Sequence, residues 1–141
     1  MTEFKRVFVD TSPIIYYLEN SSLYSDLIKR FFARCMEDNI RIVTSAITIE
    51  EYLVMPYSSG KMELADNFKR FINYVNIEVV DIDPIIAEQG AKIRGKYKSF
   101  KAMDALQIAA AMVSGCEIFF TNDKQLRQEK ELPCMTMEDL Q

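Results

Sequence analysis

The sequence lacks histidine altogether, and its three cysteines, Cys35, Cys116 and Cys134, stand far apart. Isolated cysteines do not form a disulfide framework, and no CxxC or CxxxC pair suggests a zinc site. No apolar run approaches the roughly 20 residues that span a bilayer, and the first predicted strand leaves no room for a signal peptide. We therefore expect a cytoplasmic, reduced protein without a membrane segment, whose active site would rely largely on carboxylates.

What is present is the ordinary balance of a globular protein. Hydrophobic residues make up 49% of the 141 residues and charged residues 27%, as in typical soluble domains. A chain of this length can bury a core without disulfides or a structural metal, so we expect a single domain over residues 1–141. The net charge of −4 argues against a protein that coats nucleic acid electrostatically.

One basic segment runs against this acidic balance. Ten residues without an acid contain five cations: Lys92, Arg94, Lys96, Lys98 and Lys101. The segment ends just before Asp104 and could bind a phosphate backbone there. The same pattern is typical of a solvated helix end, where cations stabilise the helix dipole, and both interpretations stay open.

Strand-like and helix-like segments alternate along the chain. The β-branched and aromatic segments predict strands at residues 4–9, 40–44, 77–82, 117–121 and about 134–136. Capping residues and apolar periodicity predict seven helices. The first opens with Ser12 as N-cap and Pro13 as first residue; the others run from about Leu23 to Glu37, from Ser45 to before Pro56, at about 61–74, after Asp83–Pro84 into the basic segment, at about 102–113 and briefly after Asp123. This alternation indicates an α/β domain of three layers, α/β/α, with a mostly parallel central sheet.

Four acidic residues stand where apolar segments end or helices begin: Asp10, Glu51, Asp104 and Asp123. In open parallel sheets, ligand sites form outside the carboxyl ends of the strands, and all four acids fall near that edge. Converging carboxylates repel one another unless a cation neutralises them, and oxygen ligands suit Mg²⁺ or Mn²⁺. We therefore predict a divalent-cation site at this edge, where helix N-termini would also favour phosphate.

Each acid also has a purely structural interpretation. Asp10 and Asp104 could cap the helices that follow them, and Asp123 could form an Asx turn. The pair Glu50 and Glu51 is harder to explain, because a helical wheel places Glu50 inside the apolar arc and Glu51 at its edge. A carboxylate beside a buried face needs a partner, but the wheel does not decide between the two.

Four motifs occur in a fixed order: VFVDTSPIIYYLE (7–19), TSAITIEEYLVMP (44–56), MDALQIAAAMVSG (103–115) and FFTNDKQL (119–126). In this combination the chain resembles the PIN-domain ribonucleases, and most closely the VapC-like toxins of toxin–antitoxin pairs. The likeness covers nearly the full length. It implies a PIN-like fold, with a parallel sheet flanked by helices, and three or four acids that bind Mg²⁺ or Mn²⁺.

The resemblance assigns the first two acids by position. Asp10 matches the family's first acid, and Thr11 matches the hydroxyl residue beside it. Ser45 and Thr48 set the register of an S-x-x-T-x-x-E pattern. Glu51, rather than its neighbour, is therefore the match for the second acid.

The other two acids follow in the same way. Asp104 matches the third acid, in D-A-L, and Asp123 matches the fourth, in T-N-D. Thr121 and Asn122 would support the site by hydrogen bonding. Met103 departs from the family, because relatives often carry proline before D-A-L, but this change removes no ligand.

The resemblance further implies a metal-dependent endoribonuclease that leaves a 5′-phosphate and a 3′-hydroxyl. Asp10, Asp104 and Asp123 would be direct or water-mediated ligands, and Glu51 would complete the shell or orient the attacking water. The implied partners are an RNA substrate, a cognate antitoxin and a second copy of the chain in a homodimer. The alternative is a non-catalytic PIN-like module that binds metal or RNA or serves as a scaffold, since a fold does not fix a function.

Two other families with acidic sites fit less well. A haloacid dehalogenase phosphatase needs a second aspartate two residues after the first, where this chain has Ser12. A response-regulator receiver needs an acidic pair at the end of the first strand, which FVDTS lacks, although Asp81 and Asp83 follow the third predicted strand.

Overall fold

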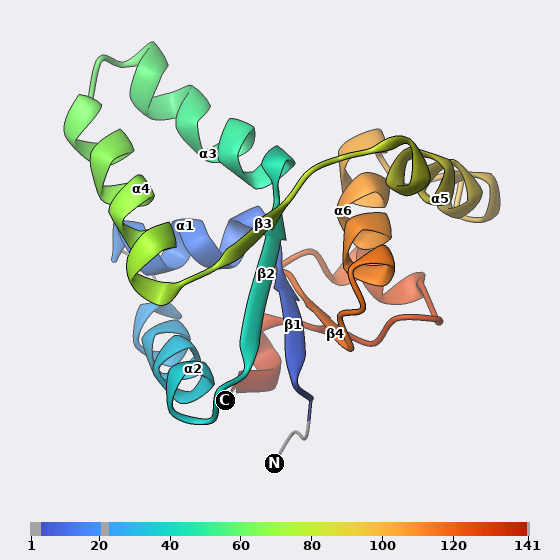
Figure 1. The fold of residues 1–141 in the computed structure, drawn as a ribbon, viewed down its shortest axis with the longest axis horizontal. Coiled ribbons are helices and arrows are strands. Elements are labelled where there is room, and N and C mark those ends of the chain that lie inside the picture. The colour runs from blue at the N-terminus through green and yellow to red at the C-terminus, as the bar shows by residue number, and fades with distance from the viewer. Residues whose placement is uncertain (1–3, 21–22, 141) are drawn as a thin grey trace.

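The computed structural model describes residues 4–20 and 23–140. Figure 1 shows a central sheet between two groups of helices. In chain order the elements are β1 (Arg6–Val9), α1 (Thr11–Glu19), α2 (Ser25–Glu37), β2 (Arg41–Ser45), α3 (Ala46–Ser58), α4 (Met62–Val75), β3 (Glu78–Val80), α5 (Pro84–Lys96), α6 (Ala102–Val113), β4 (Ile118–Phe120), η1 (Lys124–Gln128), β5 (Cys134–Met135) and η2 (Met137–Leu140).

The described strands form one five-stranded sheet in the order β3-β2-β1-β4-β5, and every neighbouring pair is parallel. β1 lies at the centre, with Phe8 in register with Val43 of β2 and with Phe119 of β4. Parallel strands need long crossover connections, and helices supply most of them here. The predicted α/β fold with a mostly parallel sheet is confirmed, and the described strands are parallel throughout.

Successive residues of the central strands point to opposite faces of the sheet. Val7 and Val9 lie in a core with residues of α1, α2, α3 and α4, whereas Phe8 lies in a second core with residues of α5 and α6. Figure 1 shows the same division, with α1–α4 on one side of the sheet and α5 and α6 on the other. The domain therefore has three layers. Within the described residues, no helix has the length and apolar character that crossing a membrane requires.

Helix α1 begins two residues earlier than the Ser12–Pro13 pair predicted. Asp10 is its N-cap residue, with extended backbone dihedral angles and a side chain that accepts the N–H of Thr11. Ser12 therefore lies inside the first turn, and its hydroxyl oxygen accepts the backbone N–H of Asn122 at 3.1 Å. The capping role proposed for Asp10 is correct, and it places this carboxylate directly at the end of β1.

Two other predicted helix boundaries were wrong. Helix α3 continues past Pro56 to Ser58. Proline removes one backbone donor, but here it falls in the last turn, where a single lost bond is tolerated. Helix α2 begins at Ser25 rather than near Leu23, which is 82% exposed. The buried stripe of α2 passes through Ser25 and Ile28, and Leu23 lies off that stripe.

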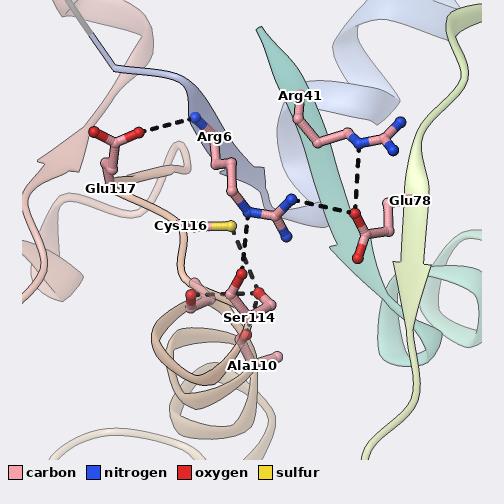
Figure 2. A network of polar contacts seen from close by, with 8 residues as sticks. Arg6, Arg41, Glu78, Ala110, Ser114, Cys116 and Glu117 are labelled. Carbon is pink, nitrogen blue, oxygen red and sulfur yellow. Dashed lines mark hydrogen bonds and ion pairs between the residues drawn. The ribbon is translucent and has the colours of Figure 1, made fainter.

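A polar network ties the amino ends of β1, β2 and β3 together (Figure 2). Glu78 Oε1 lies 3.4 Å from Arg6 Nη1 and 3.5 Å from Arg41 Nε. Arg6 Nε also donates to the carbonyl of Ser114 at 3.1 Å, and Glu117 Oε1 accepts the backbone N–H of Arg6 at the same distance. These charges lie at the sheet edge opposite Asp10, so they contribute to strand docking rather than to the predicted site.

Candidate functional site

All four predicted acids line one open cleft at the carboxyl ends of the strands. The cleft has a volume of about 530 Å³ and is lined by Asp10, Thr11, Ser12, Ile15, Glu51, Asp104, Thr121, Asn122 and Asp123. Asp10 follows β1 directly, and Thr121–Asp123 follow β4. Helices α3 and α6 contribute Glu51 and Asp104 from their first two turns. Residues separated by more than 100 positions thus meet because parallel strands end at the same edge.

Asp10 is the most constrained of these acids. Its Oδ1 accepts the backbone N–H of Thr11 at 2.9 Å and the amide of Gln107 at 3.2 Å. Its Oδ2 accepts the hydroxyl of Thr121 at 2.8 Å. Burial nevertheless raises the pKa of Asp10 above its usual value, and the nearby charge of Asp104 adds to the increase. The hydrogen bonds therefore hold the carboxylate in one orientation, and a bound cation would offset the free-energy cost of burying its negative charge.

Glu51 reaches the cleft from the outer surface of α3. Its Oε1 accepts the hydroxyl of Thr11 at 2.6 Å. Partial desolvation raises the pKa of Glu51, and repulsion from Asp10 and Glu50 raises it further, against the hydrogen bond from Thr11. Glu50 itself is exposed and does not line the cleft. The helical wheel was wrong to place Glu50 on a buried face, because the face that α3 buries carries Thr48 and Tyr52.

Asp104 and Asp123 complete the acidic lining. Asp104 lies in the first turn of α6 and makes no capping bond, since Lys101 is the N-cap residue. Burial raises the pKa of Asp104, as do the charges of Asp123 and Glu51, whereas Lys101 lowers it. Asp123 is exposed, and its Oδ1 accepts the N–H of Gln125 at 3.0 Å as the cap of η1. The Asx-turn interpretation of Asp123 is therefore compatible with its place in the cleft.

The acids are close enough to perturb one another but do not converge tightly. Within residues 4–20 and 23–140, no three acidic, histidine or cysteine side chains stand close enough to hold one ion between them. Repulsion among uncompensated carboxylates favours such spreading. Mg²⁺ keeps several of its waters and commonly binds through one or two carboxylates, so this donor set is suited to a hydrated cation.

Three predicted supporting residues also line the cleft. Thr11 and Thr121 each donate a hydroxyl to a cleft carboxylate, to Glu51 and Asp10 respectively. Asn122 instead ties the loop after β4 to α1, since its side-chain amide donates to the Tyr16 hydroxyl at 3.2 Å. The two threonines thus orient acids, whereas Asn122 fixes the cleft wall.

The basic segment does not line the cleft. Its five cations, Lys92, Arg94, Lys96, Lys98 and Lys101, are all exposed, and none lines the cleft. Lys92, Arg94 and Lys96 belong to the last turns of α5. Lys101 is the member whose charge acts on Asp104. The interpretation as a solvated helix end describes most of this segment, and a role in RNA binding stays a prediction.

Sequence reasoning missed a buried polar layer beneath the cleft. Gln107 and Thr48 are both almost fully buried and hydrogen-bonded to each other at 2.8 Å. Thr44 joins them, with its hydroxyl 2.8 Å from that of Thr48. The sequence signal for Gln107 was a single amide within ALQIAAA, a segment of α6 that is otherwise apolar.

Together the fold and the cleft define a three-layer α/β domain with four carboxylates at the carboxyl edge of a parallel sheet. The family model of the PIN domain matches residues 7–131. This match covers most of the chain, and the chain belongs to the PIN domain family. No curated protein has a significantly similar sequence.

Solved structures of toxin–antitoxin proteins share the fold. The chain is similar to VapBC2 from Rickettsia felis bound to a promoter DNA fragment, with 16% identity, 93% of this chain and 98% of that chain covered, and a TM-score of 0.74. DNA-bound VapBC from Salmonella typhimurium has 19% identity, coverage of 94% and 98%, and a TM-score of 0.68. VapC20 from Mycobacterium tuberculosis, a sarcin–ricin loop cleaving toxin, has 18% identity, coverage of 90% and 98%, and a TM-score of 0.68. At these identities the likeness establishes the fold.

Proposed function

We propose that this protein is a metal-dependent endoribonuclease that hydrolyses RNA phosphodiester bonds, and that it is the toxin of a toxin–antitoxin pair. The observation that carries the proposal is the meeting of four carboxylates in one open cleft, Asp10, Glu51, Asp104 and Asp123. Membership of the PIN domain family supports a nuclease. The similar fold of VapC20, which cleaves the sarcin–ricin loop, supports RNA as the substrate.

The donor set fits Mg²⁺ or Mn²⁺, because hard divalent cations prefer carboxylate oxygens. Asp10, Asp104 and Asp123 would hold the cation directly or through water. When bound, the cation would lower the pKa of a water molecule and stabilise the charge that develops on the phosphate. The raised pKa values of Asp10 and Asp104 support this assignment, since burial and neighbouring carboxylates disfavour both charges and Lys101 offsets only part of the effect at Asp104.

The protein's own groups would then position the attacking water. Glu51 has a raised pKa, and a carboxylate whose pKa moves toward neutrality is a better proton acceptor. Thr11 fixes one of its oxygens by a hydrogen bond of 2.6 Å. We therefore assign Glu51 to the orientation of the water and Thr11 to the orientation of Glu51.

The basic segment would hold the RNA backbone next to the cleft. Lys101 acts on Asp104 electrostatically, and Lys98 lies in the short connection between α5 and α6. An acidic cleft repels RNA, so cations on its border offset that repulsion. We expect Lys98 and Lys101 to contribute more to RNA binding than the cations on α5.

We also propose two protein partners, a cognate antitoxin and a second copy of the chain. Large apolar side chains are exposed on α3 and α4: Val54, Met55, Tyr57, Met62 and Tyr74. Exposed apolar surface often marks a protein interface, and similar folds occur in toxin–antitoxin complexes. Light scattering of the purified protein tests whether it forms a homodimer. A molar mass of a monomer at all concentrations would contradict the dimer.

A cleavage assay on a mixed single-stranded RNA pool tests the nuclease. We expect the wild type to cleave with Mn²⁺ or Mg²⁺ and to stop in EDTA, and Asp10→Asn and Asp104→Asn to be inactive yet folded. Asp66→Asn is the matched control, because Asp66 is an exposed acid of α4 outside the cleft. Metal-dependent cleavage by both cleft variants would contradict the assignment of these acids to the active site. Metal binding by a wild type that cleaves no RNA would favour the non-catalytic module.

A further inference from the structure

A buried glutamine lies directly behind the carboxylate cleft. Gln107 of α6 is 1% exposed, in a helix whose other buried residues are alanines and one isoleucine. Its Nε2 donates to Thr48 Oγ1 at 2.8 Å and to Asp10 Oδ1 at 3.2 Å. Its Oε1 accepts the hydroxyl of Ser45. A buried amide with three partners in an apolar helix face is costly to remove, because its neighbours lose their bonds as well.

The surroundings fix which way this amide faces. An ionised carboxylate only accepts hydrogen bonds, so an N–H of the amide must face Asp10. The amide oxygen then points to Ser45, whose Oγ accepts the backbone N–H of Ile47 at 3.1 Å and donates its single hydrogen to Gln107 Oε1. A flipped amide would set its oxygen against the carboxylate of Asp10, acceptor against acceptor.

The hydrogen bond from Gln107 determines which oxygen of Asp10 can still bind a cation. A carboxylate oxygen has about two acceptor positions. Oδ1 of Asp10 uses both, for Thr11 N–H and for Gln107. Oδ2 accepts the Thr121 hydroxyl, which leaves one position. A cation at Asp10 would accordingly be bound through Oδ2.

The same amide also connects Asp10 with Glu51 through buried hydroxyl groups. Thr48 Oγ1 accepts from Gln107 and lies 3.2 Å from Thr11 Oγ1. Thr11 in turn donates to Glu51 at 2.6 Å. Asp10 and Glu51 are thus held in register through the side chains of Gln107, Thr48 and Thr11.

We propose that Gln107 is a positioning residue that saturates Oδ1 of Asp10, so that Oδ2 presents its remaining lone pair to the divalent cation. Through Thr48 it also keeps Asp10 in register with Glu51. This inference rests on the proposed function, because it takes Asp10 as a cation ligand.

Calorimetric titration with Mn²⁺ alone tests the role without RNA. Gln107→Met keeps the length of the side chain and removes both donors, and we expect Mn²⁺ affinity to fall about tenfold or more, as for other residues that orient metal ligands. Gln89→Met is the control, since Gln89 lies on α5 and its amide contacts Met112 Sδ instead of an acid. We expect the control to bind Mn²⁺ as tightly as the wild type.

A second variant keeps the test decisive if Gln107→Met folds poorly. Gln107→Leu likewise removes the donors that face Asp10 and Thr48 but places no charge on the buried face of α6, and Mn²⁺ affinity should again fall. A purely structural role predicts a lower melting temperature in EDTA with unchanged Mn²⁺ affinity, and that result overturns the inference. A wild type that binds no Mn²⁺ overturns the proposed function itself.

Discussion

Thr121 offers a direct measure of how strongly the fold holds Asp10. Its side chain is 0% exposed, and its hydroxyl donates to Asp10 Oδ2 and accepts the N–H of Asp123 at 3.1 Å. Thr121→Val keeps the shape and removes both bonds. A hydrogen bond to a charged group contributes about 1.5–3 kcal/mol. Because valine recovers some apolar burial, we expect the free energy of unfolding in EDTA to fall by about 2 kcal/mol.

Thermal and urea denaturation measure this loss. With an unfolding entropy of about 2.1 cal/mol/K per residue, 2 kcal/mol corresponds to a decrease in melting temperature of roughly 7 °C for a chain of this size. A double-mutant cycle with Asp10→Asn separates the contact with the charge from the bond to the Asp123 N–H. Without the charge, the cost of Thr121→Val should shrink by about 1 kcal/mol.

Thr136→Val is the matched control. Thr136 is also 0% exposed, but its hydroxyl accepts from Arg127 at 2.9 Å, outside the cleft. This variant should lose stability yet bind Mn²⁺ and cleave RNA as the wild type does, whereas Thr121→Val should lose about tenfold in Mn²⁺ affinity. If Thr121→Val lowered the free energy of unfolding equally in the wild type and in Asp10→Asn, Thr121 would not stabilise the charge of Asp10, and this prediction would be refuted.

Three further predictions concern pH, RNA binding and the core. Asp10, Glu51 and Asp104 have raised pKa values in the folded protein, so they stabilise the fold at a pH below their unfolded pKa values near 4, and this contribution is lost as the pH rises through their folded pKa values. The melting temperature in EDTA should therefore be higher near pH 5 than at pH 7.5. A higher melting temperature at pH 7.5 would contradict this prediction. Replacement of Lys98 and Lys101 by glutamate should weaken RNA binding and reduce its salt dependence by about one unit per lost phosphate contact, while Lys69→Glu on α4 should leave both unchanged in a filter-binding assay. Phe68→Ala should lower the free energy of unfolding in urea by about 3–5 kcal/mol, because Phe68 is 1% exposed and stacks on Tyr52 with ring centroids 4.4 Å apart. A decrease below 1 kcal/mol would show that the packing of α4 does not depend on this contact.

Local sequence signals predicted the fold class and most of the helices and strands. Helix α6 spans Ala102–Val113, the predicted range, because Gly115 adopts the left-handed conformation with φ of 77° and ends it. The alternation of Val7, Phe8 and Val9 between two cores follows from strand geometry alone. For the start of α1 the sequence offered both Ser12 and Asp10 as caps; Asp10 caps the helix, whereas Ser12 is engaged by Asn122 from the other end of the chain.

The candidate site could be predicted in outline. Acids at strand ends were expected to share an edge, and the structure places all four in one cleft. The choice between Glu50 and Glu51 was not accessible to a helical wheel, because α3 buries the polar Thr48 and exposes Val54. The role of Gln107 could not be predicted, because its partners are Asp10 directly after β1, Ser45 of β2 and Thr48 of α3, and no spacing within α6 reveals them.

The most direct test of the central claim is anomalous diffraction from crystals of the protein soaked in Mn²⁺. The account predicts an anomalous peak in the cleft, beside Oδ2 of Asp10, where Asp104 would help to hold the ion directly or through water. The same peak should be absent from Asp10→Asn crystals. Mn²⁺ bound away from the four carboxylates, with RNA cleavage intact, would contradict the account.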